Sequence, residues 1–158
     1  MIQKIANTTR VLKVVSPVFT SAFSFAKHRI TNNKEFIHMD NILVTGGAGY
    51  VGSGLLRELL SMGYQVTCVD NLMFGGESLL DIWHNKNFKF IKCDINDWKA
   101  FSEILSNNKI DAVIHLAAIV GDPACKMQSK LAEQTNWEST KWLLDKCREI
   151  GIPKFLFA

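Results

Sequence analysis

Three glycines near the start of the second quarter of the sequence have the spacing of a phosphate-binding turn. Gly47, Gly49 and Gly52 fit the pattern G-x-G-x-x-G, and they follow an apolar run that ends at Val44. In such a turn the first glycine lets the chain reverse off a strand, the second lets a pyrophosphate approach bare backbone, and the third lets the next helix pack on the sheet. The N-terminus of that helix offers unpaired N–H groups and about half a positive charge to the phosphates. This stretch therefore predicts dinucleotide binding.

An acidic residue follows this turn at the distance that the same chemistry requires. Asp70 lies 18 positions after Gly52, at the end of a strand predicted over residues 65–70. The dinucleotide-binding pattern places an Asp or Glu about 20 residues on, where its carboxylate accepts hydrogen bonds from the adenosine ribose hydroxyls. That charge would repel a 2′-phosphate, so Asp70 favours NAD over NADP. The alternative is an Asp that only begins a surface turn.

The composition excludes two classes of partner. The 158 residues suffice for one domain with its own core. The net charge of +3 comes from residues 1–34, which hold six basic residues and no acid, whereas the remainder holds 12 basic against 15 acidic residues. A mildly acidic domain predicts no nucleic-acid surface. No run approaches the ~18 continuous apolar residues of a membrane span, so no membrane association is predicted.

The four cysteines are far apart in the sequence. No C-x-x-C pair accompanies them, and no histidine lies at metal-ligand spacing. Cys68 and Cys93 fall within predicted strands. We therefore predict free thiols in a reducing compartment and no metal site.

Strand and helix patterns alternate from residue 41 to the end. The predicted strands are Ile42–Val44, 65–70, 88–93, 110–116 and 154–158, and the predicted helices begin near residue 50 and span 97–105 and about 130–149. A short helix is predicted around Leu79 and Trp83. This order predicts an α/β fold, a doubly wound parallel sheet of the Rossmann type over residues 39–158, with ligands at the carboxyl ends of the strands. The sheet is expected to be incomplete at the C-terminal end, because the sequence stops within the fifth strand.

Residues 1–38 are expected to lie outside this domain. They are basic and carry no acid before Glu35. Met39 directly precedes the first strand, so the preferred interpretation is a disordered tail or an over-extended start, with the protein in the cytoplasm. A transit peptide for mitochondria or plastids is the second interpretation, and a secretory signal is the third.

Five short motifs occur in one order along the chain. They are Thr45–Gly52, Asp70-Asn71, Asp94-Ile95, His115–Ala118 and Thr135-Asn136. Together they resemble the extended short-chain dehydrogenase/reductase family, the NAD-dependent epimerase/dehydratases that act mostly on nucleotide sugars. The resemblance covers residues 41–158.

The resemblance implies a role in NAD binding for each motif. The pyrophosphate would be held by Gly46, Gly49, Tyr50, Val51 and Gly52. The adenosine ribose would be held by Asp70 and Asn71, and adenine would be flanked by Asp94 and Ile95. The path to the nicotinamide would be lined by Leu116, Ala117 and Ala118. The full-length form would bind a nucleotide sugar and form a homodimer.

Three polar residues have two interpretations each. Asn136 would reach the cofactor by resemblance, but its side chain could instead satisfy nearby backbone. His115 could serve as a base, although its position on a buried strand favours a hydrogen-bonded core residue. Asp122 follows the fourth strand near the expected substrate entrance, but an Asp before Pro is also ordinary turn chemistry.

The catalytic pair of the family is not found in this sequence. The family uses Tyr-x-x-x-Lys, in which the Tyr acts as acid and base on a sugar hydroxyl. Here Tyr50 is followed four positions later by Gly54, and Tyr64 by Cys68, so no catalytic residue is assigned. We expect the NAD-binding N-terminal part of a nucleotide-sugar epimerase or dehydratase, inactive alone.

Two other functions remain open from the residues. One is a non-catalytic module that binds NAD and regulates a partner. The other is an S-adenosylmethionine-dependent methyltransferase, because that class also has a glycine-rich turn and an acid after its second strand. The spacing of the three glycines and the run His115–Ala118 argue against the methyltransferase.

Overall fold

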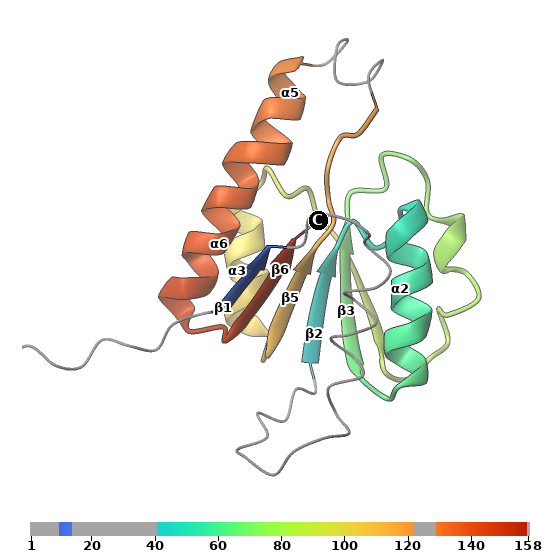
Figure 1. The fold of residues 1–158 in the computed structure, drawn as a ribbon. Helices are drawn as coiled ribbons and strands as arrows, with labels where there is room; N and C mark the ends of the chain where they lie inside the picture. The colour runs from blue at the N-terminus through green and yellow to red at the C-terminus, as the bar shows by residue number, and fades with distance from the viewer. Residues whose placement is uncertain (1–9, 14–40, 122–128, 158) are drawn as a thin grey trace, which may run out of the picture.

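The strands form one parallel sheet with helices on both faces (Figure 1). The computed structural model describes residues 10–13, 41–121 and 129–157. The strands are β1 (Arg10–Lys13), β2 (Asn41–Thr45), β3 (Gln65–Asp70), β4 (Phe88–Lys92), β5 (Ala112–His115) and β6 (Lys154–Phe157). Their order in the sheet is β1-β6-β5-β2-β3-β4, and every neighbouring pair is parallel. The predicted doubly wound Rossmann-type fold is confirmed.

Helix α2 covers one face of the sheet, and α3 with α6 covers the other (Figure 1). The helical elements are α2 (Tyr50–Ser61), η1 (Glu77–Leu79), α3 (Trp98–Asn107), α5 (Ser129–Glu133), η2 (Gln134–Glu138) and α6 (Ser139–Ile150). Successive residues of a strand point to opposite faces. Ile42 and Val44 therefore pack in the core under α2, and Leu43 in the core under α3 and α6. Both faces are apolar, as a parallel sheet requires.

Two helix ends follow the sequence signals directly. Asp97 precedes α3, and its carboxylate accepts a hydrogen bond of 3.0 Å from the backbone N–H of Ala100. This satisfies one of the free N–H groups of the first turn. Gly151 ends α6 in the left-handed region, with φ +80°, a conformation that costs glycine little. None of the described helices has the length and apolar character needed to cross a bilayer.

Two predicted helices differ from those observed. The long helix expected over about 130–149 contains a π turn, η2, between α5 and α6, in which the N–H of Ser139 donates to the carbonyl of Gln134. The segment around Leu79 forms the short 3₁₀ turn η1, and both Leu79 in this turn and Ile82 after it are buried. The apolar pattern predicted a helical segment but could not specify the helix type, because α-helices, 3₁₀ turns and π turns place side chains at similar spacings. Trp83, which the pattern grouped with Leu79, is 52% exposed.

Four residues of the N-terminal segment belong to the sheet. Strand β1 pairs with β6 from Arg10↔Lys154 to Lys13↔Phe157. The sequence placed residues 1–38 outside the domain, and the rest of that segment lies outside the described residues. In the structure β1 occupies the edge of β6 that does not pair with β5. Pairing of this kind satisfies backbone groups that would otherwise form an open edge.

Candidate functional site

A cavity of about 660 Å³ lies at the carboxyl ends of β2, β3 and β5. This is where ligands bind in open α/β sheets, and the volume suits a small-molecule site. All the residues predicted to bind the cofactor line it except Asp94 and Asn136. Those in the wall are Gly46, Gly49, Tyr50, Val51, Gly52, Asp70, Asn71, Ile95, Leu116, Ala117 and Ala118.

The turn after β2 needs glycine for two different reasons. Gly46 has φ +70°, and a Cβ there would lie 2.6 Å from the backbone nitrogen of Ala117. A Cβ on Gly52 would collide with the Gly46 carbonyl oxygen and lie 2.6 Å from the Cα of Gly47. The left-handed residue that reverses the chain is thus Gly46 and not Gly47, the first glycine of the motif. Gly52 is needed because α2 packs directly on the turn.

Gly49 differs from these glycines because it faces open space. A Cβ built on it would meet only the Gly46 carbonyl oxygen, at 3.3 Å. Its backbone is extended, with φ −71° and ψ 174°, a conformation that any residue adopts. Gly49 also lines the cavity at the N-terminus of α2. This cradle of bare backbone, beside the positive end of a helix dipole, fits a pyrophosphate.

The carboxylate of Asp70 joins the glycine turn to the end of β3. One oxygen accepts a hydrogen bond of 3.0 Å from the backbone N–H of Ala48, and the other accepts one of 2.8 Å from Leu72. A carboxylate oxygen has two lone pairs, so each retains one for a further donor. Asp70 lines the cavity, where ribose hydroxyls could supply those donors.

Asp94 lies behind the cavity wall and orients Asn71. The Asn71 amide donates to one Asp94 oxygen at 3.0 Å, and the backbone N–H of Asn96 donates to the other at 2.8 Å. The side-chain oxygen of Asn71 accepts a hydrogen bond of 2.9 Å from the backbone N–H of Met73. The structure therefore brings Asn71 and Ile95 to the wall of the cavity, and it gives Asp94 a supporting position.

Asn136 also lies outside the cavity wall, and it holds backbone. Its side-chain oxygen accepts from the N–H of Ile119, and its side-chain NH₂ donates to the carbonyl of Ile119, both at 2.8 Å. This pair of bonds fastens the segment after β5 to the π turn η2. Of the two interpretations of Asn136, the structure shows backbone satisfaction. π turns often occur at functional sites. This one directs the side chain of Asn136 to the backbone of Ile119, which lines the cavity.

His115 is a buried, hydrogen-bonded residue of β5, as its position on the strand predicted. The hydroxyl oxygen of Thr45 accepts from the N–H groups of Leu116 and Ala117, both at 3.2 Å. These bonds occupy both of its lone pairs, so its hydrogen is directed to Nδ1 of His115, at 2.6 Å. Nδ1 is therefore an acceptor, and Nε2 carries the ring proton.

The same chain of hydrogen bonds continues to the π turn. Nε2 of His115 donates to the hydroxyl oxygen of Thr140 at 2.9 Å, and that hydroxyl donates to the carbonyl of Asn136 at 2.9 Å. No donor or acceptor is left for a substrate. His115 thus connects β2, β5 and η2 behind the cavity as a neutral imidazole.

Burial of His115 predicts a pH-dependent stability. Burial lowers the pKa of the imidazole from 6.5 to about 4. The unfolded state therefore binds the proton at a higher pH than the folded state. Stability is fully present above pH 6.5 and falls as the pH drops towards 4, by about 3 kcal/mol in total. Urea unfolding between pH 7.5 and 4.5 should show this slope, and His115→Gln should flatten it.

The exposed His84 provides the control for this titration. His84→Gln removes an imidazole from the surface. The dependence of its unfolding free energy on pH should keep the slope of the wild-type protein. An equal slope in wild type and His115→Gln would contradict the neutral core assignment.

Several residues in the cavity wall have no signal in the sequence. They are Met73, Phe74, Cys93, Asn96 and Ile119. Asn96 donates to the hydroxyl of Thr135 at 2.9 Å and accepts from Ser139 at 2.8 Å, which ties the loop after β4 to η2. These partners are about forty positions apart in the sequence. Met73 and Phe74 could have been suspected only from their place in the loop that follows Asp70.

The remaining predictions concern thiols, metals and one loop. Cys68, Cys93 and Cys147 are free, and burial raises the pKa of the Cys68 and Cys147 thiols to about 12. Within residues 10–13, 41–121 and 129–157, no three His, Cys, Asp or Glu side chains gather as a metal site would require. Cys125 and Asp122 lie outside the described residues.

Comparison with known proteins shows the family to which the sequence is similar. Residues 42–158 match the family described as the NAD dependent epimerase/dehydratase family. The chain is 39% identical over 111 residues to the probable UDP-arabinose 4-epimerase 3 of Arabidopsis thaliana, a match that covers 66% of this chain and 25% of that protein. The chain therefore spans about a quarter of the length of this curated relative.

Solved structures show the same arrangement of the sheet and helices. The UDP-Glc/GlcNAc 4-epimerase of Campylobacter jejuni has a TM-score of 0.70 and 30% identity, and the match covers 75% of this chain and 36% of that one. A UDP-glucose 4-epimerase of Thermus thermophilus, solved in complex with NAD, has a TM-score of 0.65 and 29% identity, with coverage of 73% and 36%.

Proposed function

The chain belongs to the NAD-dependent epimerase/dehydratase family, and from that premise we propose that residues 41–157 form the NAD-binding part of a nucleotide-sugar epimerase or dehydratase. The observation that carries this proposal is the bare backbone at Gly49, which opens into the cavity between the N-terminus of α2 and the carboxylate of Asp70. When bound, NAD would supply the exchange of a hydride. The fold supplies the place where it is held.

Each wall of the cavity suits one part of the cofactor. The turn at Gly46–Gly52 would receive the pyrophosphate, because its backbone leaves room for phosphate oxygens. Asp70 would accept hydrogen bonds from the adenosine ribose. Ile95 would cover the adenine ring, and the small side chains of Ala117 and Ala118 would let the nicotinamide half lie close to β5.

The proposal assigns no catalytic residue to this chain. Tyr50 is 95% exposed at the start of α2, and Tyr64 is buried after it. Neither is followed by a lysine four positions later. Acid–base chemistry by a positioned side chain contributes about 10²–10⁴-fold to a rate. Residues 1–158 alone are therefore expected to bind NAD without converting a sugar.

The names of the relatives support a substrate class. The names of the proteins that this chain resembles refer to UDP-arabinose, UDP-glucose and UDP-GlcNAc. We propose a nucleotide sugar as the substrate of the whole enzyme. The regulatory-module alternative would also bind NAD. It predicts, however, that an extended form of the protein would still not turn over a sugar.

Titration calorimetry of the Asp70→Ala variant tests the choice of cofactor. The wild-type chain should bind NAD more tightly than NADP and should not bind S-adenosylmethionine. Asp70→Ala should lose about 10–100-fold in NAD affinity, since two charge-assisted hydrogen bonds to ribose are lost. Its preference for NAD over NADP should also disappear, because the negative charge that repels a 2′-phosphate is gone.

The exposed Asp145 of α6 supplies a control of the same charge. Asp145→Ala should bind NAD as the wild type does, and thermal unfolding should show that both variants are folded. Unchanged affinity of Asp70→Ala for NAD and NADP would refute the ribose assignment. Wild-type binding of S-adenosylmethionine in place of NAD would refute the proposed function.

A further inference from the structure

The loop between β3 and η1 forms one wall of the cavity and has an unusual backbone. Met73, Phe74 and Gly75 line the cavity. Among the described residues, Leu72 is the only non-glycine residue with a positive φ, +62°. A leucine in this region costs on the order of 1 kcal/mol, so other contacts must hold the loop in place. The side chains of Met73 and Phe74, which are 48% and 76% exposed, supply little of that hold.

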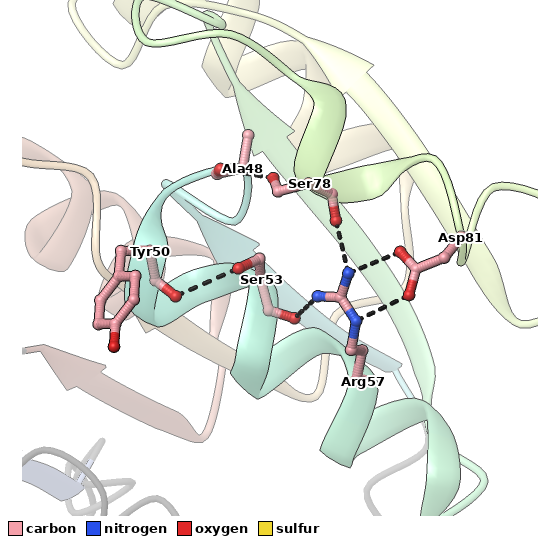
Figure 2. Close-up of polar contacts among 6 residues, drawn as sticks. All are labelled: Ala48, Tyr50, Ser53, Arg57, Ser78 and Asp81. Atoms are coloured by element: carbon pink, nitrogen blue, oxygen red, sulfur yellow. Dashed lines mark hydrogen bonds and ion pairs between the residues drawn. The ribbon is translucent and has the colours of Figure 1, made fainter.

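The far end of this loop is held by Arg57 of α2 (Figure 2). Its guanidinium donates from Nε to one oxygen of Asp81 at 2.8 Å and from Nη2 to the other at 2.6 Å. Nη2 also donates to the carbonyl of Ser78 at 2.8 Å, and Nη1 donates to the carbonyl of Ser53. One side chain therefore connects helix α2 to the segment 78–81 that follows the loop.

Ser78 extends this connection into the glycine turn. Its hydroxyl donates to the carbonyl of Ala48 at 2.7 Å (Figure 2). The N–H of the same residue, Ala48, donates to Asp70. The loop is thus tied at its beginning by Asp70 and at its end by Ser78, and both ties meet at Ala48. Arg57 holds Ser78 from behind, and neither Arg57 nor Asp81 lines the cavity.

The geometry requires an arginine. The side chains of Arg57 and Asp81 are 40% and 58% exposed, so their charge attraction alone contributes little to stability. The planar guanidinium, however, meets two carboxylate oxygens and two carbonyls at once. A lysine ammonium has no fork of donors that could reproduce this arrangement. The hydrogen bond from Arg57 also lowers the pKa of Asp81.

We propose that Arg57 is a positioning residue for NAD, which fixes the loop 71–76 and the carbonyl of Ala48 in the arrangement that receives the adenosine half of the cofactor. Arg57 does this without contacting the cofactor. The proposal rests on the proposed function, because it assigns the cavity to NAD. It adds a second layer, on the outer side of the loop, to the residues that line the site.

The first test is NAD binding by the full chain, measured by calorimetry. Arg57→Met should weaken NAD binding about 10-fold, and Arg57→Lys should recover only a small part of the loss. Arg148→Met removes an arginine that pairs with Asp145 on α6, at 3.4 Å, and it is the matched control. It should bind NAD as the wild type does. If Arg57→Lys bound NAD as tightly as the wild type, a role for the guanidinium fork would be contradicted.

Hydrogen exchange separates positioning from general destabilisation. In Arg57→Met, exchange should rise at the backbone N–H groups of Gly75 and Leu79, which donate to Leu72 and Gly76. Exchange in the central strands β2 and β5 should not change. A uniform rise throughout the sheet would overturn the proposal in favour of a merely structural role. Asp81→Asn, a milder change at the same contact, should show the same pattern with a loss of about 3-fold in NAD affinity.

The outcomes for the inference and for the proposed function are distinct. If the wild-type chain binds no NAD, the proposed function is wrong and the inference fails with it. If the wild type binds NAD and both Arg57→Met and Asp81→Asn bind it equally well, only the inference is wrong.

Discussion

Replacing Gly49 by valine is expected to abolish NAD binding and leave the protein folded. The backbone of Gly49 is extended, so a β-branched residue fits it without strain. A Cβ would meet one protein atom, the Gly46 carbonyl oxygen at 3.3 Å, and a shift of a few tenths of an ångström relieves this contact. The side chain would then occupy the space in the cavity that the pyrophosphate needs. We expect a loss of at least about 100-fold, or about 3 kcal/mol of binding free energy.

Gly54 provides the control for this substitution. It lies on α2, and a Cβ at this position would have no atom within 4 Å apart from its chain neighbours and the nearby backbone of its own helix. Gly54→Val should bind NAD as the wild type does. Calorimetry measures the affinity, and thermal unfolding should give similar midpoints for both variants. Normal NAD binding by a folded Gly49→Val variant would show that the pyrophosphate does not bind at this turn. The proposed function would then lose its basis.

Replacing Gly52 by alanine is expected to destabilise the fold itself. The new Cβ would overlap the Gly46 carbonyl oxygen and approach the Cα of Gly47 to 2.6 Å and its carbonyl carbon to 2.9 Å. All of these are backbone atoms of a tight turn, so no side chain can rotate away, and α2 would have to move off the turn. Overpacking of this kind costs about 3 kcal/mol, which corresponds to a fall of roughly 10 °C in the unfolding temperature.

The opposite result is expected at Gly54, further along the same helix. Gly54→Ala adds a methyl group in open space and removes backbone freedom from the unfolded state. It should raise stability by up to about 1 kcal/mol. Urea unfolding compares the two alanine variants directly. A Gly52→Ala variant as stable as the wild type would show that α2 does not pack against the turn as the structure has it.

The features predicted well from the sequence depend on residues that are close together in the chain. The strand, turn and helix around Gly49 follow from an apolar run, a glycine pattern and a helical period, all within about twenty positions. Asp70 follows from its distance to that turn. The capping Asp97 and the terminal Gly151 are also local signals, because each acts on backbone groups within one helical turn.

Other contacts around the site depend on pairs that only folding brings together. The sequence left two interpretations of Asn136 open, and in the structure its amide pairs with the backbone of Ile119 across a loop. Asp94 supports Asn71 from the end of the neighbouring strand. A polar residue near a strand end can point into a cavity or away from it. Its sequence position does not decide between the two, because that depends on which donors the neighbouring elements present.

The sequence by itself determined the order of strands and helices, the position of the glycine turn and the acid that follows it. These depend on side-chain period and on backbone freedom, which are properties of short stretches. Only the tertiary structure decided which glycine faces the cavity, that His115 is neutral, that β1 pairs with β6, and that Arg57 holds the loop after Asp70. The reason is that packing and hydrogen bonding join residues far apart in the chain, and no local pattern records which partners will meet.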